Sequence, residues 1–232
     1  MICRVSTVVV VTARDYELRA ALTGVSPAQP LHLGPIVATV GHVEGVRLVG
    51  IVGGVGAIAA GVVAATALSL LDDCAAIVSA GIAGAFAGRA ALGDVVVATD
   101  AVVADLGKQA NDGFVHASDV GWACTVRCAP QLVDSALAAG AQVSGQLLTV
   151  SGQSAAEEIA LELASRFPDA IGEAMEGAGV GLAASLFDVP FVEVRGISNI
   201  VGVRDRDRWN KPEALQHLGT VVAAIAPTAT RL

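Results

Sequence analysis

Apolar residues along this chain form two kinds of segment, short β-branched runs and longer stretches with helical spacing. Residues 5–12 are a nearly unbroken β-branched run, and residues 15–22 then switch to the spacing of a helix. Further strands are expected at 46–52, 75–79, 94–98, 145–150 and 191–195, and helices at 57–71, 132–139, 155–167, 177–187 and 212–225. Residues 80–93 are expected to be a glycine-rich connection. This alternation predicts an α/β fold with a central, mixed but largely parallel twisted sheet flanked by helices.

One stretch, residues 48–71, carries no charge and is long enough to span a bilayer. The Gly53-Gly54 pair inside it and Asp72-Asp73 directly after it favour a strand, a glycine turn over 53–56 and a buried helix instead. The first residues do not resemble a signal peptide, because the apolar run 8–11 is too short. We therefore expect a cytoplasmic protein with no membrane partner.

The composition further narrows the class of protein. The chain has 232 residues without a linker-like stretch, so we expect one domain over 1–232. Hydrophobic residues make up 54% and aromatic residues 3%, which suits a core of Val, Ala, Leu and Ile around a buried sheet. A net charge of −8 argues against nucleic acid as a partner. Cys124 and Cys128 lie four apart, but no nearby Cys or His completes a zinc set, so reduced thiols and no metal are expected.

Glu176 is a lone carboxylate in an apolar stretch that continues without another charge to Asp188. Burying such a group is costly unless it has committed hydrogen-bond partners. Gly177, Ala178 and Gly179 leave room beside it, and its two acceptor oxygens suit the two hydroxyls of a vicinal diol such as a ribose. The alternative is a glutamate stabilised by the NH groups and dipole of its own helix.

Other candidates follow strands, where ligands gather in α/β sheets. Glu17 falls in the first turns of the first helix, and Asn199 follows a strand expected to end at Arg195. The segment from Gly81 to Gly84 also follows a strand, and its backbone could offer NH groups to a ligand. Each has a structural alternative: a solvated helix residue, a turn residue and a plain glycine turn. No Lys follows the glycines, so they form no Walker motif.

Taken together, these motifs resemble the nucleoside phosphorylase and nucleosidase superfamily over nearly the whole chain. The matching pieces are the first strand leading to Glu17, and residues 79–84, 92–97, 167–170, 175–178 and 189–191. Residues 195–199, continuing through Gly202, 204–206 and Trp209, are similar to one hydrolase branch whose members release hypoxanthine from a nucleoside. The resemblance implies a nucleoside phosphorylase-like fold and hydrolysis of an N-glycosidic bond without cofactor or metal. It also implies a small-molecule purine nucleoside as partner and a homo-oligomer, often a homodimer whose second copy completes the pocket.

The resemblance also implies roles for the candidate residues. Glu17 would be the catalytic acid/base that activates water near the anomeric carbon. Glu176 would hold the ribose hydroxyls, and Met175 would pack against the sugar. The remaining substrate-binding candidates are Ile82, Ala83, Gly84 and Gln153.

Asn199 falls where adenine-specific nucleosidases of the superfamily carry an aspartate that protonates the leaving base. An amide cannot supply that proton, but it can donate to an oxygen or ring nitrogen that gathers negative charge. Hypoxanthine can leave with its charge spread over O6 and N7, so the charge argument favours a 6-oxopurine. Geometry alone leaves adenine open, because an amide can also bridge N6 and N7.

Hydrolysis is favoured over phosphorolysis, because Ile82 stands where the phosphorylases would carry a phosphate-binding hydroxyl. Arg14, close to Glu17, keeps a phosphate ligand open. The superfamily's aromatic base-stacking residue is missing here, and Gln153 or a neighbour within 151–155 occupies its region. The candidates to replace it are Phe86, Phe114 and Trp122.

The nucleoside of the similar hydrolase branch carries a benzoate-like carboxylate, which calls for a cation. The interleaved Asp205 and Asp207 favour a self-neutralising surface loop over a carboxylate site, with Trp209 as its packing anchor. The cationic candidates in that loop are Arg204, Arg206 and Arg208.

Three alternatives stay open. They are a methylthioadenosine/adenosylhomocysteine nucleosidase, an inosine-type phosphorylase, and a purine-nucleoside sensor without activity. A sensor would keep Glu176 but tolerate loss of Glu17, so the presence of both disfavours it.

Overall fold

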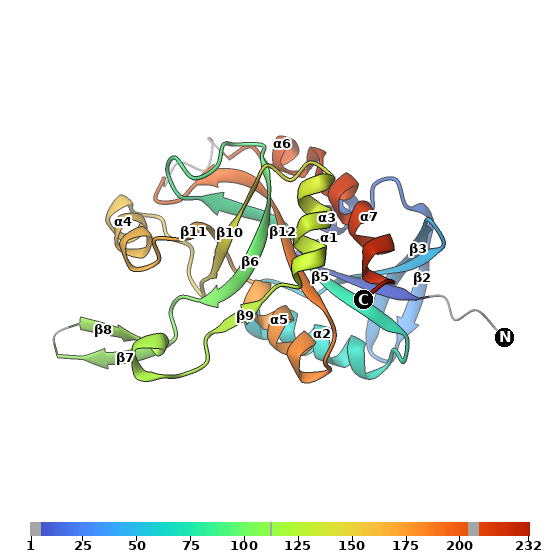
Figure 1. Cartoon of the computed structure of the whole chain (residues 1–232), viewed down its shortest axis with the longest axis horizontal. Helices are drawn as coiled ribbons and strands as arrows, with labels where there is room; N and C mark the ends of the chain where they lie inside the picture. The colour runs from blue at the N-terminus through green and yellow to red at the C-terminus, as the bar shows by residue number, and fades with distance from the viewer. Residues whose placement is uncertain (1–5, 112, 204–208) are drawn as a thin grey trace.

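Strand β1 (Thr7–Thr12) is buried along its whole length, as its β-branched run predicts. The computed structural model describes residues 6–111, 113–203 and 209–232. In it, β1 lies between β4 (Val46–Val52) and β5 (Cys74–Ala85) and runs parallel to both. These three strands lie side by side in the large sheet drawn in Figure 1.

The sheet has the order β11-β10-β6-β12-β5-β1-β4-β3-β2, with β9 added to β6. Its other strands are β2 (Ser26–Leu33), β3 (Ile36–Val43), β6 (Val95–Val103), β9 (Thr125–Arg127), β10 (Val143–Thr149), β11 (Ala170–Ala174) and β12 (Phe191–Ile200). Pairing is mixed: β12 is parallel to β5 but antiparallel to β6. Because β11 also pairs with β5, the strands from β11 to β5 close on themselves like a small barrel.

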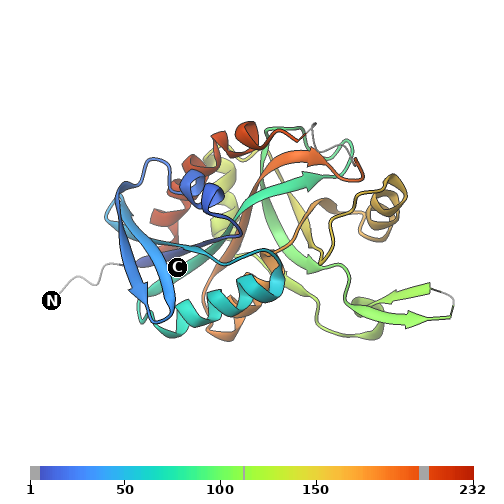
Figure 2. The same ribbon diagram turned by 180° about the vertical axis from the view of Figure 1, so that it is seen from behind.

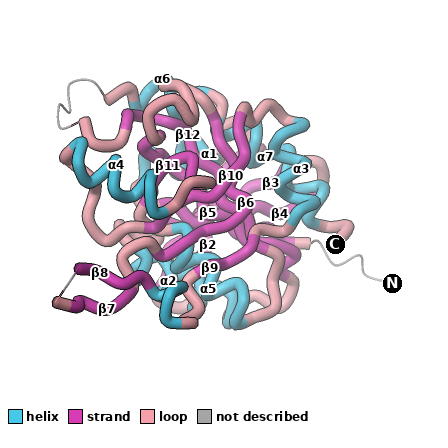
Figure 3. Tube along the Cα trace, turned by 60° about the vertical axis from the view of Figure 1, so that its left-hand side comes forward, coloured by secondary structure: helices cyan, strands magenta, loops and turns pink. Residues whose placement is uncertain are grey.

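Helices cover both faces of the sheet, as Figures 1 and 2 show. On one face, α2 (Ala57–Ser69) packs against α5 (Gly177–Leu186). The helices of the other face are α1 (Asp15–Ala21), α3 (Pro130–Ala138), α6 (Lys211–Gln216) and α7 (Leu218–Ala229). The large core lies between these layers, and a smaller cluster lies under α4 (Glu157–Arg166) at the barrel end. The hairpin β7 (Gly107–Ala110) and β8 (Gly113–His116), with the short helix η1 (Ala117–Val120), projects from the body in Figure 3.

The uncharged stretch 48–71 folds as expected, with β4, a glycine turn and α2 in sequence. No helix in the described parts of the chain is both long and apolar enough to cross a membrane. The predicted helices after β1 and around Glu176 are also confirmed, with small shifts at their ends.

Several elements differ from the prediction. Strand β5 continues to Ala85 instead of ending at 79, because its glycines pair in register with β12. Strand β12 likewise continues to Ile200, so Asn199 lies within it. The expected helix over 212–225 is two helices, since α6 packs on β12 whereas α7 packs on α1 and α3. The strands that were not expected are β2, β3, β7, β8, β9 and β11; of these, β2 and β3 extend the sheet edge in an antiparallel hairpin.

Candidate functional site

All eight residues that the sequence assigned to the site line one cavity of about 860 Å³. They are Glu17, Ile82, Ala83, Gly84, Gln153, Met175, Glu176 and Asn199. The cavity opens where β1, β10 and β11 end, the edge at which α/β sheets collect ligands. Its volume is in the range of small-molecule sites.

Glu17 is the third residue of α1 and is buried. The backbone NH of Arg14 donates to Oε2 at 2.9 Å, and that of Ile82 donates to Oε1 at 3.0 Å. Burial raises the pKa of Glu17, against the lowering effect of the nearby Arg195 guanidinium and of these NH groups. A carboxyl group with a raised pKa, fixed at the wall of a cavity, suits proton transfer near neutral pH.

One backbone NH group of the glycine-rich segment is used within the protein. At least at Ile82, the NH holds the Glu17 carboxylate in place rather than facing a ligand.

Glu176 begins α5 as its N-cap, but its side chain makes no hydrogen bond to its own helix. Its Oε1 accepts from the backbone NH of Gly56 at 3.0 Å, and its Oε2 accepts from Arg195 Nη1 at 3.1 Å. The helix-capping alternative is therefore wrong, because the carboxylate is fixed by partners from other elements and lines the cavity.

Arg195 is the main residue that sequence reasoning did not assign to the site. Its guanidinium is 1% exposed and donates to Glu176, to Glu193 Oε1 at 2.9 Å and to Ser79 Oγ at 3.0 Å. A Cβ placed on Gly81 would lie 2.7 Å from Glu17 Oε1 and 2.8 Å from Arg195 Nη1, so the acid and the guanidinium converge on this glycine. The sequence did contain a signal for Arg195. Glu193 and Arg195 are charged residues two positions apart in an apolar strand, so their side chains share one face.

One buried cation thus lies among three carboxylates, those of Glu17, Glu176 and Glu193. Burial also raises the pKa of Glu193, whose Oε2 has no hydrogen-bond partner within the described structure. Excess negative charge in a dry site favours uptake of a proton.

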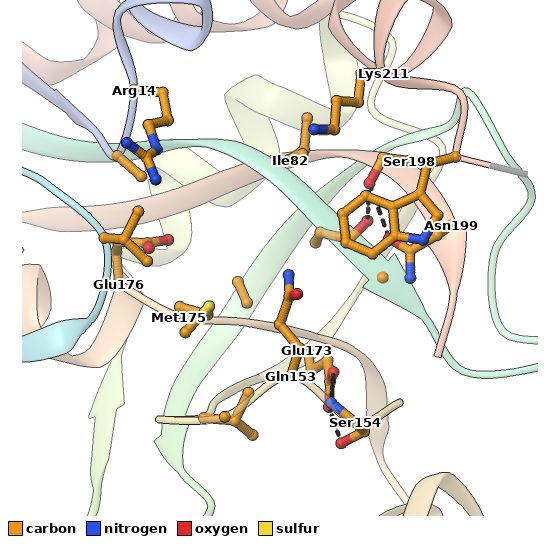
Figure 4. A pocket seen from close by; sticks show the side chains of 18 of the residues that line it. Arg14, Ile82, Gln153, Ser154, Glu173, Met175, Glu176, Ser198, Asn199 and Lys211 are labelled. Atoms are coloured by element: carbon orange, nitrogen blue, oxygen red, sulfur yellow. Dashed lines mark hydrogen bonds between the residues drawn. The ribbon is translucent and has the colours of Figure 1, made fainter. Parts of the chain in front are cut away.

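Asn199 lies on the opposite side of the cavity from Arg14 and Glu176 in Figure 4. Its Oδ1 accepts from the Ser198 hydroxyl at 2.9 Å, and its Nδ2 donates to the backbone carbonyl of Ile200 at 3.3 Å. In the sheet it stands directly opposite Gly84 of β5. The amide is therefore oriented by its own strand at the cavity wall.

The three aromatic residues expected to cover a base do not line the cavity. Phe86 is buried in the smaller core cluster. Phe114 lies on the projecting hairpin, where the guanidinium of Arg166 from α4 covers its ring. Trp122 lies at the surface, and the ammonium group of Lys108 covers its ring. The sequence analysis had not predicted the extension of β5 or the projecting hairpin, so it could not place these side chains.

Tyr16 and Trp209 are the aromatic residues of the cavity wall within the described ranges. Trp209, which the sequence analysis expects to anchor its loop, lines the cavity, and its Nε1 is buried without a hydrogen-bond partner among the described residues. Lys211 Nζ lies between them, 5.8 Å from the centre of the Tyr16 ring and 5.5 Å from that of Trp209.

Among the residues that the structure describes, two cationic side chains line the cavity, Arg14 and Lys211. They lie at different parts of its upper rim in Figure 4. The arginines expected to carry a carboxylate site, Arg204, Arg206 and Arg208, lie outside the described residues together with Asp205 and Asp207.

Glu173 is a further lining residue that the sequence did not single out. It lies on β11, and both of its oxygens accept from Ser154, Oε1 from the backbone NH at 2.8 Å and Oε2 from the hydroxyl at 2.6 Å. Burial raises its pKa, against the lowering effect of these two hydrogen bonds. No group of three His, Cys, Asp or Glu side chains that could hold a metal ion occurs in the described part of the chain.

Comparison with known proteins identifies the family of this chain. A family model described as the phosphorylase superfamily matches residues 7–229. A futalosine hydrolase of Streptomyces coelicolor is 42% identical over 152 residues, 65% of this chain and 65% of that protein. A futalosine hydrolase of Acidothermus cellulolyticus is 39% identical over 155 residues, 64% of this chain and 63% of that protein. The matched region thus spans a little under two thirds of these relatives.

Solved structures extend the likeness to nearly the full length. An S-adenosylhomocysteine nucleosidase from Streptococcus pyogenes, in complex with 5-methylthiotubericidin, matches with a TM-score of 0.83 and 23% identity over 97% of this chain and 98% of that one. A methylthioadenosine/adenosylhomocysteine nucleosidase from Colwellia psychrerythraea, in complex with adenine, has a TM-score of 0.82 and 20% identity over 97% and 96% of the two chains. At these identities the likeness shows the fold alone.

Proposed function

The chain belongs to the phosphorylase superfamily, and from this premise we propose that it is a nucleosidase that hydrolyses the N-glycosidic bond of futalosine. The products are hypoxanthine and dehypoxanthine futalosine, a step of menaquinone formation. The observation that carries the proposal is the convergence of Glu17 and Glu176 on Arg195 at the wall of one cavity. The relatives with 42% and 39% identity, both futalosine hydrolases, support the choice of substrate.

Glu176 is assigned to the ribose. Its carboxylate is held by Gly56 and Arg195 and keeps acceptor capacity for the two hydroxyls of a vicinal diol. Met175, next to it in the cavity wall, supplies apolar contact to the sugar. Positive charge that builds on the ribose as the glycosidic bond breaks is stabilised by the surrounding carboxylates.

Glu17 is assigned to the attacking water. As the water oxygen bonds to the anomeric carbon, one water proton passes to the Glu17 carboxylate, and the base leaves with the electron pair of the broken bond. The raised pKa of Glu17 makes it a better proton acceptor than an exposed glutamate. Arg195 restrains that rise and positions the carboxylates around the water.

Asn199 is assigned to the leaving base. Its amide donates to the part of a 6-oxopurine where negative charge collects, which assists departure without a proton from the protein. The rest of the wall around it comes from the β5 backbone at Ala83 and Gly84 and from Gln153.

A substrate with an aromatic carboxylate is supported by the cationic and aromatic residues of the wall. Lys211 lies between the rings of Tyr16 and Trp209, and the indole NH of Trp209 is a buried donor. We assign the carboxylate of the benzoate-like tail to Lys211 or Arg14, whose charges it would neutralise.

Three broader features belong to the same proposal. The protein is placed in the cytoplasm, as one domain over 1–232. It is proposed to act as a homo-oligomer without cofactor or metal.

The assay for this function incubates the purified protein with futalosine, methylthioadenosine or inosine, with and without phosphate, and identifies the released base. We expect hypoxanthine from futalosine at a rate that phosphate does not change. Dependence on phosphate would establish a phosphorylase instead, and release of adenine from methylthioadenosine as the fastest reaction would establish the adenine-specific alternative. Absence of any release would favour a sensor.

A further inference from the structure

Glu193 is a buried carboxylate behind the cavity wall to which the mechanism gives no task. It lies on β12 between Val192 and Val194 and is 0% exposed. Taking a carboxylate out of water is costly, and an apolar side chain at this place would avoid the cost. A charge kept here therefore points to a role beyond packing.

The carboxylate of Glu193 holds the Nε side of the Arg195 guanidinium. Its Oε1 accepts from Arg195 Nε at 2.9 Å. The other two nitrogens of the guanidinium donate to Glu176 and to Ser79. Glu193 also pairs in register with Ser79 of β5, so these two anchors of the arginine stand side by side in the sheet. Because a guanidinium is a rigid planar fork, contacts at all three nitrogens fix both its position and its tilt.

The Glu193 carboxylate is also fitted to the start of α5. A Cβ on Gly177, the first residue of this helix, would collide with both oxygens of Glu193. The room that the glycine leaves beside Glu176 is thus filled by a second carboxylate and not by a ligand. Its Oε2 has no hydrogen-bond partner within the described residues, so Arg195 is the group that this carboxylate serves.

Arg195 acts on the reaction through the carboxylates around it. Its guanidinium is 1% exposed, and it donates to Glu176 from behind the cavity wall. Burial raises the pKa of Glu17, and the charge of Arg195 opposes this rise. A guanidinium released at Nε would be free to move toward the remaining two carboxylates. That movement would draw Glu176 away from the sugar and lower the pKa of Glu17 further.

Titratable and charged groups reach the Glu193–Arg195 pair and Glu17 from three places outside β12. They are Arg14, Tyr16 and Glu17 at the start of α1, Glu176 at the start of α5, and Cys128 before α3. The charge of Arg195 interacts with all three carboxylates of the cluster. A change at Glu193 is therefore transmitted to the other two through this one guanidinium.

We propose that Glu193 is a positioning residue of the hydrolysis, which anchors Arg195 from behind and so fixes the Glu176 carboxylate and the charge that Glu17 experiences. Its effect on the reaction rests on the proposed function, whereas the anchoring itself needs no turnover. Glu193 contacts neither the sugar nor the attacking water and takes no part in bond making.

The test compares the wild type with two variants of this residue. Glu193→Gln keeps the shape and the acceptor for Arg195 Nε but removes the charge, and Glu193→Asp keeps the charge but shortens the reach. Glu158→Gln, in an exposed glutamate of α4, is the control. For each protein, kcat and KM for futalosine are measured from acidic to neutral pH. The pKa of Glu17 is measured by NMR of its carboxyl carbon, with Glu17→Gln to assign the signal.

Glu193→Gln should move the acidic limb of the kcat/KM profile to lower pH by about one unit, and the pKa of Glu17 should fall with it. Its KM should rise about ten-fold, because Glu176 loses a fixed partner. Glu193→Asp should keep the acidic limb in place and raise KM about three-fold, and Glu158→Gln should change neither.

A lower kcat in Glu193→Gln with an unmoved acidic limb and an unchanged Glu17 pKa would show a merely structural role and overturn the proposal. If Glu193→Gln does not fold, the proposal is decided by Glu193→Asp, whose KM would then have to exceed that of the wild type.

Failure of the hydrolase proposal looks different. A protein that releases no base from futalosine, but whose Glu17 pKa falls in Glu193→Gln, would overturn the proposed reaction and leave the anchoring standing. A protein that hydrolyses futalosine with the same pH profile and KM in wild type and Glu193→Gln would overturn the positioning role alone.

Discussion

At the scale of single residues, the buried carboxylates at the cavity differ in their hydrogen-bond partners. Glu17 accepts two backbone NH groups and lies near Arg195, whereas Glu176 is bonded to that guanidinium directly. Burial raises the pKa of Glu17 even with the cation nearby. The partners therefore favour a proton-transfer role for Glu17 and a binding role for Glu176.

Replacing Glu17 tests this division. Glu17→Gln should lower kcat on futalosine by about two to four orders of magnitude, because the amide cannot take the proton of the attacking water. Nucleoside affinity should change little, since Glu176 and Asn199 remain. Steady-state kinetics and calorimetric binding measure the two quantities, with Glu158→Gln as the surface control. Near-normal kcat would remove Glu17 from the reaction.

Glu17 should also make the protein less stable as the pH rises. Its folded pKa is raised above the ordinary value of 4.5, so the unfolded chain loses this proton first. The stability contribution is complete below pH 4.5 and is lost as the pH rises through the folded pKa. The Tm of Glu17→Gln relative to wild type should therefore improve between pH 4.5 and pH 8. Thermal scans at both pH values measure it, and a constant difference would contradict the raised pKa.

Lys211 provides a residue-scale test of the carboxylate tail. Lys211→Met should raise KM for futalosine by about ten-fold, since a charge-assisted contact is lost while the aliphatic stem is kept. Inosine, which lacks the carboxylate, should show no change. Lys108→Met on the projecting hairpin is the control. Equal effects on both nucleosides would assign the tail to another residue.

At the scale of elements, glycines bring the site together. Helices α2 and α5 carry no charged residue and pack closely through small side chains. A Cβ on Gly179 would collide with the backbone carbonyl of Ala57, at the start of α2. Glu176 is the N-cap of α5, and Gly56, whose NH donates to the Glu176 carboxylate, directly precedes α2, so the contact between the two helices fixes this carboxylate.

Enlarging Gly179 tests the contact between the two helices. Gly179→Ala should destabilise the fold by about 1–3 kcal/mol, because overpacking against a backbone atom exceeds the gain of about 1 kcal/mol in helix propensity. Urea denaturation measures the change. Gly152→Ala is the control, since a Cβ there meets nothing within 4 Å. Equal free energies of unfolding for the two variants would show that α2 and α5 can move apart without cost to make room for the added methyl group.

At the scale of the whole molecule, the exposed face of α2 and α5 is apolar. We name as the α2–α5 patch the side chains of Val55, Ile58, Val62, Leu182 and Leu186. Ile58 is 86% exposed and Leu186 is 77% exposed, and neither helix carries a charge. We expect this exposed apolar surface to be an interface with a second copy of the chain. Val55 also lines the cavity, so a second copy on the patch would border the site.

The assembly prediction follows from this patch. The wild type should be a dimer by light scattering at micromolar concentration, and Ile58→Glu should shift it toward the monomer. Leu161→Glu, an exposed leucine of α4 outside the patch, should leave the dimer intact. A monomeric wild type, or a dimer that survives Ile58→Glu but not Leu161→Glu, would place the interface elsewhere.

The sequence by itself determined the fold class and the membership of the site. Strand and helix periods are local properties, so β1, β4, α1, α2 and α5 were predictable from their own residues. The eight candidate residues lie in one cavity because they lie close to or beyond the carboxyl ends of β1, β5, β10, β11 and β12. Glu17, Glu176 and Asn199 were found in this way.

Only the tertiary structure decided what these residues contact. Arg195, Glu173 and Trp209 became visible as site residues through strand register and through packing between segments far apart in the chain. The extension of β5 through its glycines was hidden for the same reason, because pairing with β12 outweighs their low strand propensity. Hydrogen-bond distances and burial set the chemistry of a carboxylate, and these are fixed only when the strands pair.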